Sequence, residues 1–193
     1  MKTTRITMPR GARDLVSMLT DDQYAWGDRL ARLQGWRGRD AAQAAAAQSA
    51  QRLAPALCAV GAIVGGALSS PEVLAFFAAT AVIGAHADHH PFEVVYNATA
   101  RRLSWPTLPA NRAAHKLGCV LGITFLGGAA LAFAAGAATV GLILAGIMGA
   151  TGMFVAATGI CVPSLVFTLL WGAERGSCSG FRVGACVPAR SAR

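Results

Sequence analysis

Residues 117–173 read LGCVLGITFLGGAALAFAAGAATVGLILAGIMGATGMFVAATGICVPSLVFTLLWGA and contain no Asp, Glu, Lys or Arg. A helix needs about 20 apolar residues to cross a hydrocarbon core about 30 Å thick. The block is therefore long enough for two crossings. A helix of a soluble domain usually keeps a polar face toward water, so the block predicts membrane helices.

A second apolar block, residues 53–85, carries a single charge, Glu72. The sequence Ser69-Ser70-Pro71 divides it, because these residues favour a turn and proline suits the first turn of a helix. We predict an all-α, polytopic integral membrane protein with four transmembrane helices in two hairpins. The predicted crossings are 53–69, 71–87, 117–136 and 140–162. The last could continue to Trp171 after a kink at Pro163.

The distribution of charge gives this topology an orientation. The 17 Lys and Arg residues divide into nine in residues 1–52, four in the loop 86–116 and four after residue 173. Four crossings place all three regions on one side, which the positive-inside rule makes cytoplasmic. We therefore predict a multi-pass protein of the bacterial inner membrane with both termini cytoplasmic. Its domains are a basic extension (1–52), a transmembrane domain (53–172) and a basic tail (173–193).

The extension contains a predicted amphipathic helix. Thr20-Asp21-Asp22-Gln23 resembles a capping box, and Trp26, Leu30 and Leu33 follow at helical spacing among arginines. Such a helix suits the membrane surface, with Trp171 as a further interface anchor; a helix packed on a partner protein is the alternative. The net charge of +8 is explained by anionic lipid headgroups, and we expect no nucleic-acid partner.

Small residues recur four positions apart in three of the predicted crossings. Such spacing produces a smooth helix face on which another backbone can pack closely. Packing within the bundle and docking against another subunit both fit this pattern. The pairs are Gly61 and Gly65, Gly118 and Gly122, Ala145 and Gly149, and Gly152 and Ala156.

Few residues have the character of a chemical site. His86, His89 and His90 lie at the end of the second crossing and His115 lies at the start of the third. Imidazole binds Zn, Fe or Cu, so a single metal ion or a haem is an alternative to ordinary boundary histidines. No cofactor is otherwise predicted.

Two further residues in the apolar blocks have alternative interpretations. Cys58 and Cys161 could form a buried thiol pair, although inert cysteines are the simpler interpretation. Glu72 fits the N-terminus of a helix better than an ion pathway.

Three short motifs resemble a known family. They are His90-Pro91-Phe92-Glu93 with Tyr96-Asn97, Leu108-Pro109-Ala110-Asn111-Arg112, and Cys161-Val162-Pro163-Ser164. Over residues 50–170 the chain resembles the DUF4395 family of small bacterial four-helix membrane proteins. The resemblance implies a four-helix membrane fold and no established activity. Some members carry a closer cysteine pair where this chain has Cys161 alone.

The sequence favours a non-catalytic role. We expect an accessory or scaffold subunit that contacts lipids and the transmembrane subunits of a larger assembly, such as a respiratory or photosynthetic complex. The alternative is a redox, metal or haem protein that uses the histidines or thiol chemistry at Cys161.

Overall fold

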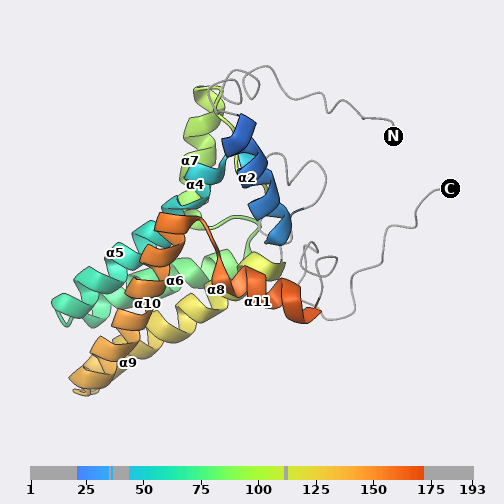
Figure 1. Ribbon diagram of the computed structural model, residues 1–193. Coiled ribbons are helices and arrows are strands. Elements are labelled where there is room, and N and C mark those ends of the chain that lie inside the picture. Colours follow the sequence, from blue (N-terminus) through green and yellow to red (C-terminus); the bar gives the residue numbers. More distant parts are fainter. Residues whose placement is uncertain (1–20, 35, 37–43, 111–112, 172–193) are drawn as a thin grey trace.

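The computed structural model describes residues 21–34, 36, 44–110 and 113–171, and the regular structure in these ranges is helical (Figure 1). Two helices precede the first apolar block, and a π-helical segment, η1, interrupts the third predicted crossing. The elements are α2 (Asp21–Leu33), α4 (Gln48–Gln51), α5 (Leu53–Ala67), α6 (Pro71–His86), α7 (Pro91–Arg102), α8 (Ala113–Gly122), η1 (Ile123–Gly127), α9 (Gly128–Ala134), α10 (Ala138–Thr158) and α11 (Val162–Trp171).

Three helical segments within the described residues are long and apolar enough to cross a membrane. They are Gln48–Ala67, His115–Ala134 and Ala138–Thr158, with 20, 20 and 21 residues. The apolar helix α6 is shorter, with 16 residues. The long spans match the first, third and fourth predicted crossings to within a few residues at most ends, and the chain therefore has the character of a membrane protein.

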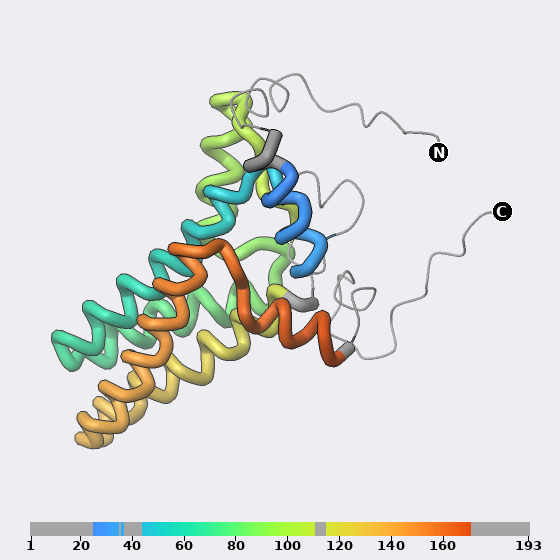
Figure 2. The backbone as a smooth tube through the Cα atoms, viewed as in Figure 1, coloured from blue at the N-terminus to red at the C-terminus, as the bar shows by residue number. Residues whose placement is uncertain are grey.

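The apolar helices form one bundle, seen side-on in Figures 1 and 2. Helix α10 packs along α5, while α6 contacts α5, α8, η1 and α9. Leu74 of α6 and Leu126 of η1 are fully buried where these helices meet. Most of the remaining core consists of alanine and glycine, which brings the helix backbones close together.

Short turns at one end of the bundle connect consecutive apolar helices. Ser70 caps α6 by accepting a hydrogen bond from the Val73 backbone N–H over 3.3 Å, and Pro71 is the first residue of that helix. Gly136 adopts a φ of 77° after α9, a conformation that favours glycine. Both turns lie where the sequence predicted a break.

The segment 86–116, predicted as the loop between the second and third crossings, contains the helix α7 at Pro91–Arg102. The segment that follows is fixed by Asn97, whose side chain donates to the Leu108 carbonyl over 3.2 Å and accepts from the Leu108 N–H over 2.7 Å. The Tyr96 hydroxyl donates to the Pro106 carbonyl over 2.9 Å. Helices α2, α4 and α7, with residues 103–110, make a folded layer over one end of the bundle, which we call the cap.

The prediction for the end of the fourth crossing also needs correction. Helix α10 ends at Thr158, and Gly159 takes a φ of 74°, so the break precedes Pro163. The cap holds this break: Gln34 donates to the Gly159 carbonyl over 2.8 Å and Arg52 donates to the Ala157 carbonyl over 3.0 Å. Helix α11 then runs in a different direction from α10 and packs on α8 (Figure 2).

Candidate site at the cap end of the bundle

The four histidines occupy different environments at the cap end. His86 is exposed, and its Nδ1 lies 2.9 Å from the Val82 carbonyl oxygen. His115 packs against Trp36 of the cap, with ring centroids 4.5 Å apart. His90 is 5% exposed and packs against Phe92.

The predicted metal site is not assembled by these positions. Among the residues that the structure describes, no three His, Cys, Asp or Glu side chains are placed to hold a metal ion together. The Nδ1 atoms of His89, His90 and His115 are buried without a hydrogen-bond partner among the described residues.

Burial sets the protonation state of the cap histidines. Burial lowers the pKa of His90 from an ordinary value of 6.5 to about 4, because a charged imidazole is poorly solvated there. Burial also lowers the pKa of His89, with a raising contribution from Asp88 and a smaller lowering one from Arg101. We therefore expect both rings to be neutral at pH 7.

Gly84 of α6 brings His90 close to a cysteine that sequence reasoning passed over. A Cβ atom at Gly84 would lie 2.7 Å from Cδ2 of His90 and 3.1 Å from Sγ of Cys119 on α8. Only glycine leaves room for both groups at this point. The signal in the sequence is a glycine in the last turn of α6, two residues before His86.

Cys119 lies toward the same end of the bundle as Cys58 and Cys161, the two cysteines that the sequence suggested as a pair. A Cβ atom at its neighbour Gly118 would lie 4.0 Å from Cys161 Sγ, so this part of α8 runs beside Cys161. Cys161 lies in the link between α10 and α11, where its sulfur accepts a hydrogen bond from Ser164 Oγ over 3.1 Å. Three thiols from three separate segments therefore lie toward the cap end of the bundle, with Cys119 beside His90. Thiols and imidazole are donors for soft metal ions and thiols are sites of redox chemistry.

The small-residue stripes contact neighbouring helices of the same chain. A Cβ at Gly61 or Gly65 of α5 would collide with Phe77 or Leu74 of α6. On α10, Gly149 faces Ile63 and Gly152 faces Ala59. The stripes thus serve packing within the bundle, the simpler of the two interpretations.

The remaining packing residues have less crowded surroundings. A Cβ at Gly118 would lie 4.0 Å from Cys161 Sγ, and one at Gly122 would lie 3.4 Å from Ala81 Cβ. Ala145 is 2% exposed beside Gly66 of α5, whereas Ala156 is only half-buried.

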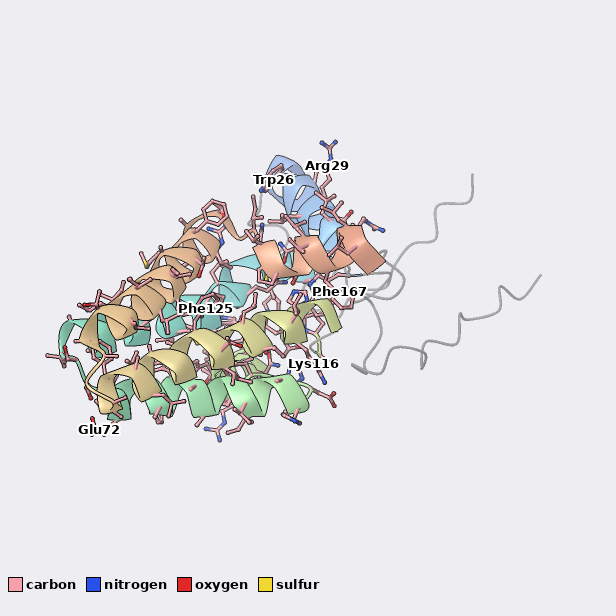
Figure 3. All side chains as sticks on the ribbon, turned by 90° about the horizontal axis from the view of Figure 1, so that it is seen from below. Trp26, Arg29, Glu72, Lys116, Phe125 and Phe167 are labelled. Carbon is pink, nitrogen blue, oxygen red and sulfur yellow. The ribbon has the colours of Figure 1, made fainter. Side chains whose placement is uncertain are left out.

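The anchor prediction is corrected at Leu30. This residue is 4% exposed and packs inside the protein, whereas Trp26 and Leu33 are 55% and 59% exposed. Figure 3 shows Trp26 and Arg29 projecting outward from α2. The side chain of Trp171, as well as Thr20, Cys178 and Cys186, lies outside the described residues.

Glu72 sits at the other end of the bundle from Lys116 (Figure 3). Its carboxylate accepts a hydrogen bond from the Ser70 hydroxyl over 2.9 Å in the first turn of α6. This position supports the helix-terminus interpretation, because a negative charge is favourable at a helix N-terminus.

Over the described residues, these observations define a helical protein with three helices suited to the membrane and a cap at one end. The chain belongs to the DUF4395 family, described as a domain of unknown function, whose model matches residues 47–171. The motif residues His90, Glu93, Tyr96, Asn97 and Leu108 all lie in the cap, where the Glu93 carboxylate accepts from the His90 N–H over 2.8 Å. Comparisons with curated proteins and with solved structures give no match.

Proposed function

We propose that the protein crosses the bacterial inner membrane four times, as two hairpins. The shorter helix α6 then joins the three long spans as the second crossing in chain order. Helix α6 is about 24 Å long at 1.5 Å per residue, shorter than a hydrocarbon core of about 30 Å. It nevertheless packs against α5, α8, η1 and α9. A helix packed against membrane-crossing neighbours shares their surroundings, and a shorter span is accommodated by local thinning of the bilayer.

The cap lies on the cytoplasmic side in this proposal. The turns around Ser69 and Gly136 carry no cation, whereas all 17 Lys and Arg residues belong to the segments at or beyond the cap end of the bundle. The positive-inside rule then assigns the cap end to the cytoplasm.

We infer an accessory, non-catalytic role for this architecture, and the outer surface of α7 is the observation that carries it. Val95, Leu103 and Trp105 are 67%, 52% and 49% exposed, beside the exposed Arg101 and Arg102. This surface belongs to the cap, which the proposal places outside the bilayer, so lipid tails do not cover it. Exposed apolar side chains away from lipid favour an interface with another protein, here a subunit of a larger membrane assembly, such as a respiratory or photosynthetic complex.

Purification from native membranes in mild detergent tests this role. We expect stoichiometric partner subunits with the unmodified chain and their loss with the Val95→Asp/Trp105→Asp variant. The matched control is Leu131→Ala, at a residue of α9 that is 74% exposed on a candidate span and should keep the partners. A monodisperse protein without partners from native membranes would contradict the accessory role.

A second candidate function is thiol chemistry. Cys58, Cys119 and Cys161 favour it because they lie toward the cap end of the bundle, where Cys119 is beside His90. The thiols would serve as a redox site within the membrane. Metal analysis, a visible absorption spectrum and counting of free thiols in the purified protein discriminate this function from a scaffold role. A colourless, metal-free sample whose thiols do not react with added oxidants would exclude this function. Where metal, colour or thiol oxidation is detected, Cys119→Ala should abolish it.

A further inference from the structure

Helix α11 exposes one continuous apolar face. Val162, Val166, Leu169 and Leu170 are 45%, 43%, 84% and 68% exposed. Their spacing of four, three and one residues places them on one side of a helix. The opposite side holds Ser164, which is fully buried. The helix therefore packs against the protein with one side and exposes apolar side chains on the other.

The polar groups of α11 are satisfied without water. The Thr168 hydroxyl donates to the Ser164 carbonyl over 2.7 Å, and the Ser164 hydroxyl donates to Cys161 Sγ over 3.1 Å. No charged residue occurs between Val162 and Trp171. The outer face offers nothing that water or a polar partner would recognise.

The position of α11 prevents it from crossing the membrane. It has ten residues, about 15 Å of helix, or half of a hydrocarbon core. It starts at the cap end, where Gln34 and Arg52 hold the carbonyls at the end of α10. From there it leaves the line of α10 and runs beside α8 (Figures 1 and 2).

The neighbouring surfaces indicate what covers the outer face. Helix α8, on which α11 packs, exposes Val120 and Leu121 on a candidate membrane span, so both of these packed helices present apolar side chains on their outer sides. The sequence after α11 carries four arginines and one glutamate in residues 173–193. An apolar helix face followed by basic residues fits the boundary between acyl chains and anionic headgroups.

We infer that α11 is an interfacial helix whose outer face, formed by Val162, Val166, Leu169 and Leu170, lies in the leaflet at the cap end. It fixes the depth of the bundle in the bilayer. This inference rests on the proposed crossing of the bundle.

Spin labels on the full chain in vesicles of phosphatidylcholine and phosphatidylglycerol test the inference. Single cysteines replace Leu169, Ile147 and Trp105 in a variant whose five native cysteines are changed to Ala or Ser. Collision with oxygen, which concentrates in acyl chains, is compared with collision with a water-soluble nickel chelate. Ile147, 41% exposed in the middle of α10, provides the lipid reference, and Trp105, 49% exposed in the cap, provides the water reference.

We expect the oxygen-to-nickel ratio at position 169 to fall between those of the two references. A value equal to the position 105 reference, or protection from both reagents, would overturn the inference, since the face would then meet water or protein. A water-like value at position 147 would instead refute the crossing of the bundle. Where loss of the cysteines unfolds the protein, a photoreactive amino acid at position 169 of the native chain replaces the label. Phospholipid adducts support the inference, and polypeptide adducts overturn it.

Discussion

At Gly152 of α10, the backbone of α5 occupies the space that a side chain would need. A Cβ atom at this position would lie 2.9 Å from Cβ of Ala59, 3.0 Å from the Pro55 carbonyl oxygen and 3.4 Å from Cα of Ala59. None of these atoms belongs to a flexible side chain. The substitution Gly152→Ala can therefore be accommodated only if the two helices move apart.

The cost of that movement follows from ordinary contact distances. Carbon atoms prefer separations of about 3.5–4.0 Å, so α5 and α10 must separate by roughly 0.5–1 Å at this point. Overpacking of this kind destabilises a folded protein by about 1–3 kcal/mol. Alanine is also a better helix former than glycine, by about 0.8–1 kcal/mol, which offsets part of the cost.

The variant Gly146→Ala isolates the packing term. Gly146 belongs to the same helix, but a Cβ there meets nothing within 4 Å. Both variants gain the same helix propensity, so the difference between their free energies of unfolding should be about 1–3 kcal/mol, with Gly152→Ala the less stable. The measurement is unfolding in mixed micelles of a mild detergent and dodecyl sulfate, followed by tryptophan fluorescence.

The double variant Gly152→Ala/Ala59→Gly provides an internal check. Removing the Ala59 methyl group relieves the 2.9 Å contact but leaves the Pro55 carbonyl oxygen at 3.0 Å, so stability should recover in part. Equal stability of Gly152→Ala and Gly146→Ala, or no recovery in the double variant, would show that α5 and α10 do not pack at this distance.

Three further predictions concern the cap. Asn97→Ala should destabilise the protein by about 1–3 kcal/mol, because both groups of the buried Leu108 backbone lose their partner; chemical unfolding checks this, and Asn97→Asp should retain only the bond from the Leu108 N–H. The pKa of His90 is lowered from 6.5 to about 4, so the unfolded chain takes up a proton first and stability falls from pH 6.5 to pH 4, by up to about 1.4 kcal/mol per pH unit. Unfolding at several pH values should show a shallower fall in His90→Asn, and identical slopes would contradict the burial of a neutral ring. Arg52→Gln should loosen the end of α10, since the bond to the Ala157 carbonyl is lost; hydrogen exchange should speed up at residues 159–161 and stay unchanged near Gly136.

The apolar helices could be predicted from the sequence because a bilayer imposes length and composition directly. The uncharged block 117–173 and the turn at Ser69-Ser70-Pro71 locate the helix ends to within a few residues. The turn at Gly136 falls between two predicted crossings, and the left-handed backbone conformation at this position favours glycine. At these places the local turn residues and the helix length that a bilayer requires predict the same helix ends.

The cap could not be predicted because its structure depends on contacts between distant residues. Helix α7 begins with Pro91, yet only half of its twelve residues are apolar, and its order depends on the bonds of Tyr96 and Asn97 to the following segment. The break at Gly159 was assigned to Pro163 because the proline is the stronger local signal. The bonds from Gln34 and Arg52 to the end of α10 cross more than a hundred residues of sequence, and no local pattern contains them.

The same reasoning explains why the sequence paired Cys58 with Cys161 and overlooked Cys119. The pair was chosen because the two residues lie in the first and last crossings, but the space beside Gly84 decides which groups meet. That space admits the His90 ring and the Cys119 sulfur together. A methyl group at position 84 would displace both while leaving every thiol in the chain. Gly84→Ala therefore distinguishes two interpretations. If the thiols and His90 only pack together, the variant changes the free energy of unfolding alone. If they form a functional site, the variant also changes ligand binding or the reaction of the thiols with oxidants.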